Sequence, residues 1–181
     1  MKFKHITAVA LSGALLAGFS GGAGAQTANA KSKDTIKVSQ IKTSPKQAVK
    51  KAKSVYGGQK VKEIAFEKSH GKWAYKVSQH KPGKESEVIV ANKTNKVLSK
   101  ETEKEDHMDK NKSFNYKGAI NYKKALKKGQ SKFKGDIGEW SLSKKHGKKL
   151  VYDMDLKKGK TKHEVSVDAK SGKVLSNEKD D

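Results

Sequence analysis

The sequence has no cysteine, no arginine and only two prolines. Without cysteine the chain has no disulfides, no thiolate metal ligands and no cysteine nucleophile. All 41 of its basic residues are lysines, which lack the planar fork with which arginine reads phosphate or guanine. Sequence-specific binding of nucleic acid is therefore disfavoured, whereas loose attraction to a polyanion needs only summed positive potential.

Acidic residues are also few, 19 against 41 lysines, so the formal net charge is +22. Hydrophobic residues make up 33% of the chain. That share suffices for modest cores but is small for one large domain with a deeply buried active site.

The N-terminus has the layout of a secretory signal peptide. Lys2 and Lys4 precede the apolar run ITAVALSGALLAGF. At about 14 residues this run is short for a membrane span, which needs roughly 20. Small residues ending at Ala25 or Ala30 offer cleavage sites. We predict a signal peptide over residues 1–25 with cleavage there or after residue 30, and a secreted or extracellular protein with no transmembrane segment in the mature chain.

A helix followed by an antiparallel meander is predicted after the leader. Ser44 can cap the helix, Pro45 suits its first position, and the glycines at 57–58 end it. Between these bounds apolar residues recur with the helical period. Runs of alternating apolar and polar residues, separated by turn residues, then extend to Leu98 and indicate strands.

The same pattern restarts in the second half of the chain. Asn121 can cap a second helix whose apolar stripe runs to Phe133, with Gly135 as its stop. Equivalent positions, such as Tyr75 and Tyr152, lie 77 residues apart. The shared positions are mainly apolar and turn residues, so we interpret the pattern as an internal duplication rather than as repetitive lysine composition.

These patterns predict an α+β fold of two tandem repeats after a signal peptide, each repeat one helix packed on a three- to four-stranded antiparallel sheet. Repeats of this size bury little surface alone. Each repeat is therefore expected to be only marginally stable by itself, or else the two sheets cover each other. The alternation that places Ile89 opposite Val88 hints at a second buried face. The predicted segments are a signal peptide (1–25), a polar lead-in (26–40), repeat 1 (41–101), a charged linker (102–117) and repeat 2 (118–181).

The most similar stretches of the two halves are VIVANKTNKVLS at 88–99 and VSVDAKSGKVLS at 165–176. In the second stretch Asp168 can accept backbone hydrogen bonds at a turn, and Gly172 can adopt positive φ. Asn95 stands at the glycine position of the first, and asparagine tolerates the left-handed region well. The repetition thus indicates a conserved hairpin geometry and not a catalytic loop.

VSVDAKSGKVLS is similar to the closing hairpin of the PepSY domain family, and TSPKQAVKKAKSVYGG resembles the family's helix. HGKWAYKV and KKLVYDMDL resemble its tyrosine-containing middle strand. The chain looks like a tandem pair of such domains over roughly 41–101 and 118–181, although the first copy lacks the Asp and Gly of the closing turn. The family occurs in propeptides of thermolysin-like metalloproteases, in a spore-germination protein and in stand-alone exported proteins. The resemblance implies a protein that binds, and inhibits or regulates, an extracellular peptidase.

No catalytic, cofactor-binding or metal-ligating residue is assigned, and no cofactor is expected. Asp153 and Asp155 should face the same way on a strand, but paired carboxylates need a cleft between them for hydrolysis, so a solvated face is the simpler interpretation. The histidines lack the spacing of a metal pair. We therefore predict a protein that is not an enzyme.

Lysines crowd the polar faces of both predicted helices. They are either solvated faces or a means of retention on wall polyanions or anionic lipid at the cell envelope. The second interpretation makes a cationic cell-envelope-binding protein the alternative function. The lysines concerned are Lys42, Lys46, Lys50, Lys51 and Lys53 on the first helix and Lys123, Lys124, Lys127, Lys128 and Lys132 on the second.

Overall fold

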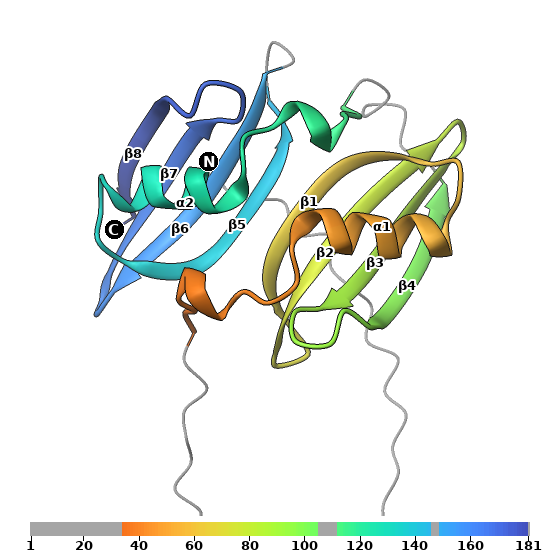
Figure 1. Ribbon diagram of the computed structural model, residues 1–181, viewed down its shortest axis with the longest axis horizontal. Helices are drawn as coiled ribbons and strands as arrows, with labels where there is room; N and C mark the ends of the chain where they lie inside the picture. Colours follow the sequence, from red (N-terminus) through yellow and green to blue (C-terminus); the bar gives the residue numbers. More distant parts are fainter. Residues whose placement is uncertain (1–33, 105–111, 146–148, 181) are drawn as a thin grey trace, which may run out of the picture. The chain divides into compact units, whose positions relative to one another are not determined.

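The structure, a computed structural model, describes residues 34–104, 112–145 and 149–180. It contains two α-helices and an eight-stranded antiparallel sheet within one compact unit (Figure 1). The α+β class predicted from the sequence is therefore confirmed. The predicted signal peptide and both of its cleavage sites lie outside the described residues.

The elements follow one another in the same order in the two halves. In chain order they are η1 (Val38–Gln40), α1 (Pro45–Val55), β1 (Lys60–Ser69), β2 (Lys72–Lys81), β3 (Lys84–Ala91), β4 (Val97–Lys104), η3 (Tyr116–Gly118), α2 (Tyr122–Gln130), β5 (Asp136–Lys144), β6 (Leu150–Lys158), β7 (Thr161–Asp168) and β8 (Val174–Asp180).

Both helices begin where their capping residues predicted. The Ser44 hydroxyl accepts a hydrogen bond from the Gln47 amide, which forms one half of a capping box. The Asn121 side chain accepts one from the Lys123 amide. The expected end of the second helix at Gly135 is wrong, because α2 stops at Gln130. Gly135 instead permits close packing on β6, since a Cβ there would lie 2.8 Å from the Lys157 nitrogen.

The sheet has the strand order β4-β3-β2-β1-β5-β6-β7-β8. Each half forms a meander, and the two meanders join edge to edge where β1 pairs with β5. Of the two alternatives considered from the sequence, the one in which the two sheets cover each other is therefore wrong. Ile89 lies on the sheet face opposite Val88 and is half-buried, so it does not mark a second core.

Strands β1 and β5 pair at the junction as if the two halves were related by two-fold symmetry. Ala65 pairs with its own equivalent, Ser141, because the two halves are offset by 76 residues in this strand, while Ile64 pairs with Leu142 and Phe66 with Trp140. Such self-complementary pairing is characteristic of a symmetric dimer interface, formed here within one chain.

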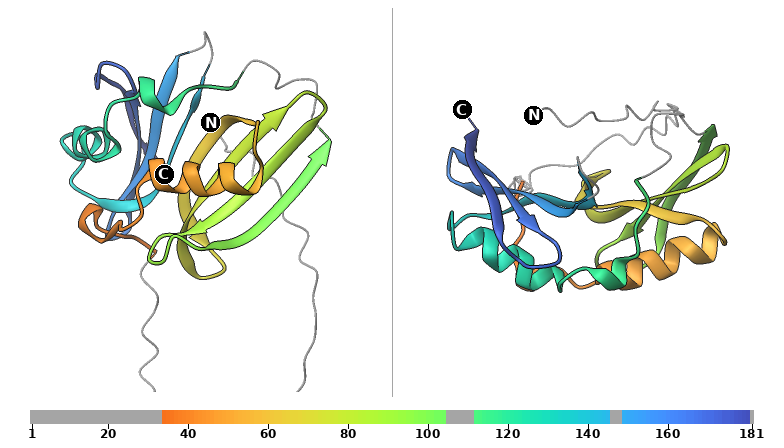
Figure 2. Two further views of the ribbon diagram at one scale, coloured as in Figure 1. Left: turned by 45° about the vertical axis from the view of Figure 1, so that its right-hand side comes forward. Right: turned by 90° about the horizontal axis from the view of Figure 1, so that it is seen from above.

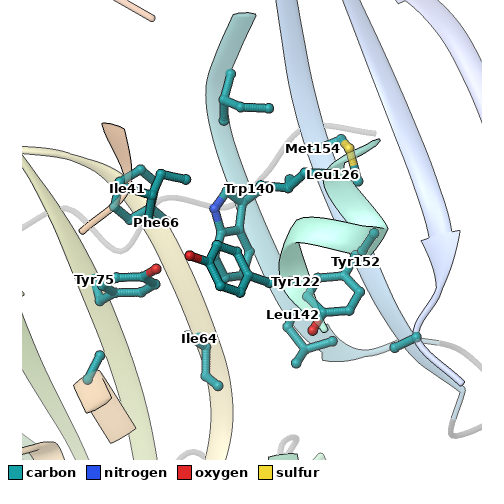
Figure 3. Close-up of a cluster of buried hydrophobic side chains, with 14 of the residues drawn as sticks. Ile41, Ile64, Phe66, Tyr75, Tyr122, Leu126, Trp140, Leu142, Tyr152 and Met154 are labelled. Carbon is teal, nitrogen blue, oxygen red and sulfur yellow. The ribbon is translucent and has the colours of Figure 1, made fainter. Parts of the chain in front are cut away.

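One core runs through both halves beneath the helices. Trp140 is its centre, with ring centroids 5.8 Å from Tyr75, 5.8 Å from Tyr122 and 6.1 Å from Phe66 (Figure 3). Since Phe66 and Tyr75 come from repeat 1 and the other rings from repeat 2, neither half completes this core alone.

Each half also sends its leading segment across the junction; we call residues 34–43 the first arm and residues 112–120 the second arm. The backbone of Ile36 bridges Ile137 at the start of β5, and that of Phe114 bridges Val61 at the start of β1. Ile36 is buried and Phe114 half-buried. The residues that the sequence suggested were a polar lead-in (26–40) and a charged linker (102–117) thus include two reciprocal arms. They also include the end of β4, which continues to Lys104.

Helices α1 and α2 cover the same face of the sheet (Figure 2, right). Within the described residues, no helix covers the other face, which we call the open face. By the strand alternation it carries the side chains of Ala65 and Ser141 near the junction. The two faces differ in charge, and this difference defines the candidate site.

Candidate binding groove on the helix face

A large groove runs over the helix face between α1, the second arm and the ends of β1, β5 and β6. Its apolar lining consists of Val49, Val61, Phe114, Tyr116, Ala119, Tyr122 and Leu150. Its cationic lining consists of Lys46, Lys50, Lys53, Lys60, Lys117, Lys144, Lys149 and Lys170. We call this feature the basic groove.

Little counter-charge faces the basic groove among the described residues. None of its lysines forms an ion pair with another described residue. Asp168 is its single acidic lining residue. Hydrogen bonds from the amides of Lys170 and Ser171 hold the Asp168 carboxylate in its hairpin and keep the pKa of that carboxyl below its ordinary value.

The N-termini of both helices open onto the basic groove, because the N-cap residues Ser44 and Asn121 line it. Helix N-termini carry partial positive charge, so acidic residues in the first turn stabilise a helix. Neither helix has one there. Lys46 and Lys123 occupy the second helical position instead, which adds positive potential where stability would favour the opposite sign.

The two arms differ at the residue that follows their short 3-10 helices. Ile41 and Ala119 each follow the short 3-10 helix of their arm as its C-cap. Ile41 is buried in the core, whereas Ala119 is half-buried and lines the groove.

The open face has the opposite character, since acidic side chains gather there. Their positions follow from the cross-strand pairs and the alternation of side chains along each strand. They are Glu63, Glu67, Glu85, Glu87, Glu101, Glu103, Glu139, Asp153, Asp155, Glu164, Glu178 and Asp180.

Lysines on or beside the open face neutralise many of these acids. Lys145 lies 3.0 Å from Asp153, and Lys162 lies 2.9 Å from Asp155 and 2.7 Å from Asp180. The open face therefore contains much of its own counter-charge. The lysines of the basic groove, by contrast, form no ion pair with a described residue.

The carboxylates around Lys76 remain crowded. The pKa of Glu87 is raised to about 7, chiefly by burial and also by the nearby carboxyls of Glu101, Glu67 and Glu63, against the lowering effect of Lys76. Burial likewise raises the pKa of Glu63. In the described part of the chain, no group of three or more acidic or histidine side chains is arranged to hold a metal ion.

The paired carboxylates considered from the sequence lie on one face, as the alternation predicted, but not as a solvated pair. Asp155 is 5% exposed and bound to Lys162, while Asp153 is bound to Lys145. Both are committed to ion pairs on the open face.

The helix lysines that the sequence suggested for polyanion binding are divided by the fold. Lys46, Lys50 and Lys53 of α1 line the basic groove, whereas the lysines predicted on the second helix do not. Sequence reasoning missed the lysines that the strands and turns contribute. It also missed Phe114 and Tyr116, although two aromatic residues within a segment otherwise rich in charge were an available signal.

Among the described residues, no helix is both long and apolar enough to cross a membrane. No curated protein matches the sequence. Three solved structures match it. One, a candidate lipoprotein from Clostridium difficile 630, has a TM-score of 0.73 at 24% identity, and the match covers 82% of this chain and all of that one. It shows that the same fold occurs in another protein.

A second solved structure is that of a candidate periplasmic protein from Bacteroides eggerthii DSM 20697. It has a TM-score of 0.30 at 13% identity and covers 76% of this chain and 89% of that one. The model of one protein family matches the chain twice, over residues 42–101 and 119–178, and its description is "Peptidase propeptide and YPEB domain". The two matches fall on the two halves that the β1–β5 junction joins, and the chain therefore belongs to the PepSY family, as a tandem pair of its domains.

Proposed function

We propose that this protein is an exported, non-enzymatic binding protein that inhibits or regulates an extracellular peptidase. The basic groove carries the proposal, because it is a surface with uncompensated charge and an apolar floor. The description of the family as a peptidase propeptide domain supports a peptidase as the partner. The leader-like N-terminus supports export.

Binding rather than catalysis is supported by how the reactive side chains are used. Asp153 and Asp155 are held by lysines on the open face, away from the basic groove. The groove contributes lysines, aromatic rings and helix N-termini, which are groups that hold a ligand by charge and shape.

Crosslinking in the producing cells, followed by identification of the captured proteins, tests the proposal. We expect a secreted peptidase among them, and we expect the purified protein to lower the activity of that peptidase in a concentration-dependent way. Capture of no peptidase under conditions in which other extracellular partners are captured would refute the proposal.

A second candidate function is retention at the cell envelope through wall polyanions or anionic lipid. The unpaired lysines of the groove favour it, because their field reaches about 8 Å at physiological salt. Binding of this kind weakens steeply as salt rises. If it operates, washing intact cells with high salt elutes the protein, and elution that does not depend on salt excludes it.

A further inference from the structure

From the chemistry of the basic groove we infer its ligand class: an extended polypeptide segment that carries both acidic and apolar side chains. This inference rests on the proposed function insofar as the partner is a protein. It goes further in naming the surface and the chemistry that recognise the partner.

The positive charge of the basic groove predicts a negatively charged ligand. Eight lysines line the groove, and none is paired within the described residues. The N-termini of α1 and α2 add positive partial charge at Ser44 and Asn121. Carboxylates along a bound chain would supply the counter-charge that the open face supplies to its own lysines.

The distribution of the lysines indicates an extended ligand. Lys46, Lys50 and Lys53 come from α1, Lys60 from the start of β1, and Lys117 from the second arm. The remaining lysines come from other elements: Lys144 ends β5, Lys149 precedes β6, and Lys170 lies in the turn after β7. Charges spread over so many elements match a chain with repeated acidic groups better than one compact anion.

The apolar lining of the basic groove favours a polypeptide ligand over a simple polyanion. Phe114 and Tyr116 are half-buried and face the groove together with Val49. An anionic polymer without apolar groups would leave these side chains in contact with water. A peptide whose acidic and apolar residues alternate can bury them while its carboxylates meet the lysines, because extended chains point successive side chains to opposite sides.

Lys46 contributes its charge to the groove at some cost to the stability of helix α1. It follows Pro45 in the first turn of α1, where a cation opposes the helix dipole. A glutamate there would favour the helix.

The test measures binding of three fluorescent probes to the full mature protein by anisotropy. One is a 12-residue peptide of alternating glutamate and leucine or phenylalanine, the second is oligoglutamate of equal charge, and the third is inorganic polyphosphate of equal charge. The groove variant is Lys46→Glu with Lys50→Glu. Its matched control is Lys124→Glu with Lys128→Glu, which makes the same charge change at the same spacing on α2, outside the groove.

We expect the amphipathic peptide to bind most tightly and the groove variant to weaken it at least about tenfold, with a change of less than about threefold in the control. Tyr116→Ala should weaken the amphipathic peptide but not oligoglutamate, with far-UV circular dichroism verifying the fold. Equal loss in the groove and control variants would overturn the inference. Polyphosphate binding that is as tight as peptide binding and insensitive to Tyr116→Ala would also overturn it, in favour of a polyanion site.

The two proposals can fail separately. If a peptidase is captured from cells and is retained equally by the groove variant and the control variant, the proposed function stands and the groove is not its surface. If the peptide binds the groove as expected but no peptidase is captured, the ligand class stands and the identity of the partner is wrong.

Discussion

The hydroxyls of Tyr75 and Tyr152 make the same hydrogen bond in the two halves of the protein. The Tyr75 hydroxyl donates to the carbonyl of Thr43, and the Tyr152 hydroxyl donates to the carbonyl of Ile120. The distance between the two oxygens is 2.8 Å in each bond. Each acceptor is the residue just before a helix N-cap. The middle strand of each meander thus fixes the start of the helix that packs on it.

Replacing Tyr75 by phenylalanine removes this bond and leaves a buried carbonyl without its donor. We expect Tyr75→Phe to lower the free energy of unfolding by about 1–2 kcal/mol in urea titration. Tyr56→Phe is the control, because the Tyr56 hydroxyl makes no hydrogen bond within the described residues, and its effect should stay below about 0.5 kcal/mol. Equal effects of the two changes would contradict a special role for the bond.

The shared core predicts that both halves unfold together. Trp73 reports on repeat 1 and Trp140 on the junction, so each can be isolated by replacing the other with phenylalanine. In each single-tryptophan variant, the fluorescence and far-UV circular dichroism transitions in urea should coincide. A Trp73 transition at lower urea than the loss of secondary structure would mean that repeat 1 unfolds independently.

Gly129 of α2 and Met154 of β6 form a matched pair. A Cβ at Gly129 would overlap the Met154 sulfur. In the first half the equivalent residues are Ala52 and Val77, a larger helix residue over a smaller strand residue. Compared with the first half, the second half thus has a smaller residue on the helix and a larger residue on the strand.

This exchange predicts coupling between the two positions. Gly129→Ala should be less favourable by about 1–3 kcal/mol with Met154 present than in the background of Met154→Val, which reproduces the combination of the first half. A double-mutant cycle of unfolding free energies measures the coupling. Additive effects would mean that Met154 moves aside at no cost.

The raised pKa of Glu87 predicts a pH dependence of stability. The folded protein holds this proton up to about pH 7, whereas the ordinary pKa is 4.5. Between these values the unfolded chain loses the proton first, so this carboxyl lowers stability as pH rises from about 4.5 to 7. Glu87→Gln should remove that decline, which urea titrations from pH 4 to 8 can measure.

The control for this prediction is Glu103→Gln, which makes the same charge change at an exposed site on β4. It should not alter the slope of stability with pH in this window. A parent protein whose stability rises from pH 5 to 7 relative to Glu87→Gln would show that the sign is wrong.

The local parts of this fold could be predicted because their signals are local. Ser44 and Asn121 fix the starts of the helices through their own side chains. Asn95 and Gly172 adopt positive φ, 54° and 75°, as the hairpin pattern required. The repeat relationship was also readable, since apolar and turn residues recur in register.

The junction and the groove could not be predicted because they depend on partners far apart in sequence. The alternation around Ala65 is the same whether its strand lies at an edge or in the middle of a sheet. The lysines of the groove come from a helix, an arm and several strand ends, and each looks like an ordinary solvated residue in its own segment. Phe114 looked like part of a connection because its place in the fold depends on its bridge to Val61 and its packing against the core, both of which join residues far apart in the sequence.

The difference between Ile41 and Ala119 has a consequence for how such proteins diverge. If two separate copies of one repeat were joined by the same self-complementary edge, both arms would carry the same residue at this position. Fusion into a single polypeptide fixes the stoichiometry at one to one and releases each arm to change alone. One arm can then keep a buried isoleucine while the other places a half-buried alanine at the basic groove, an inequality that a homodimer encoded by one gene cannot acquire.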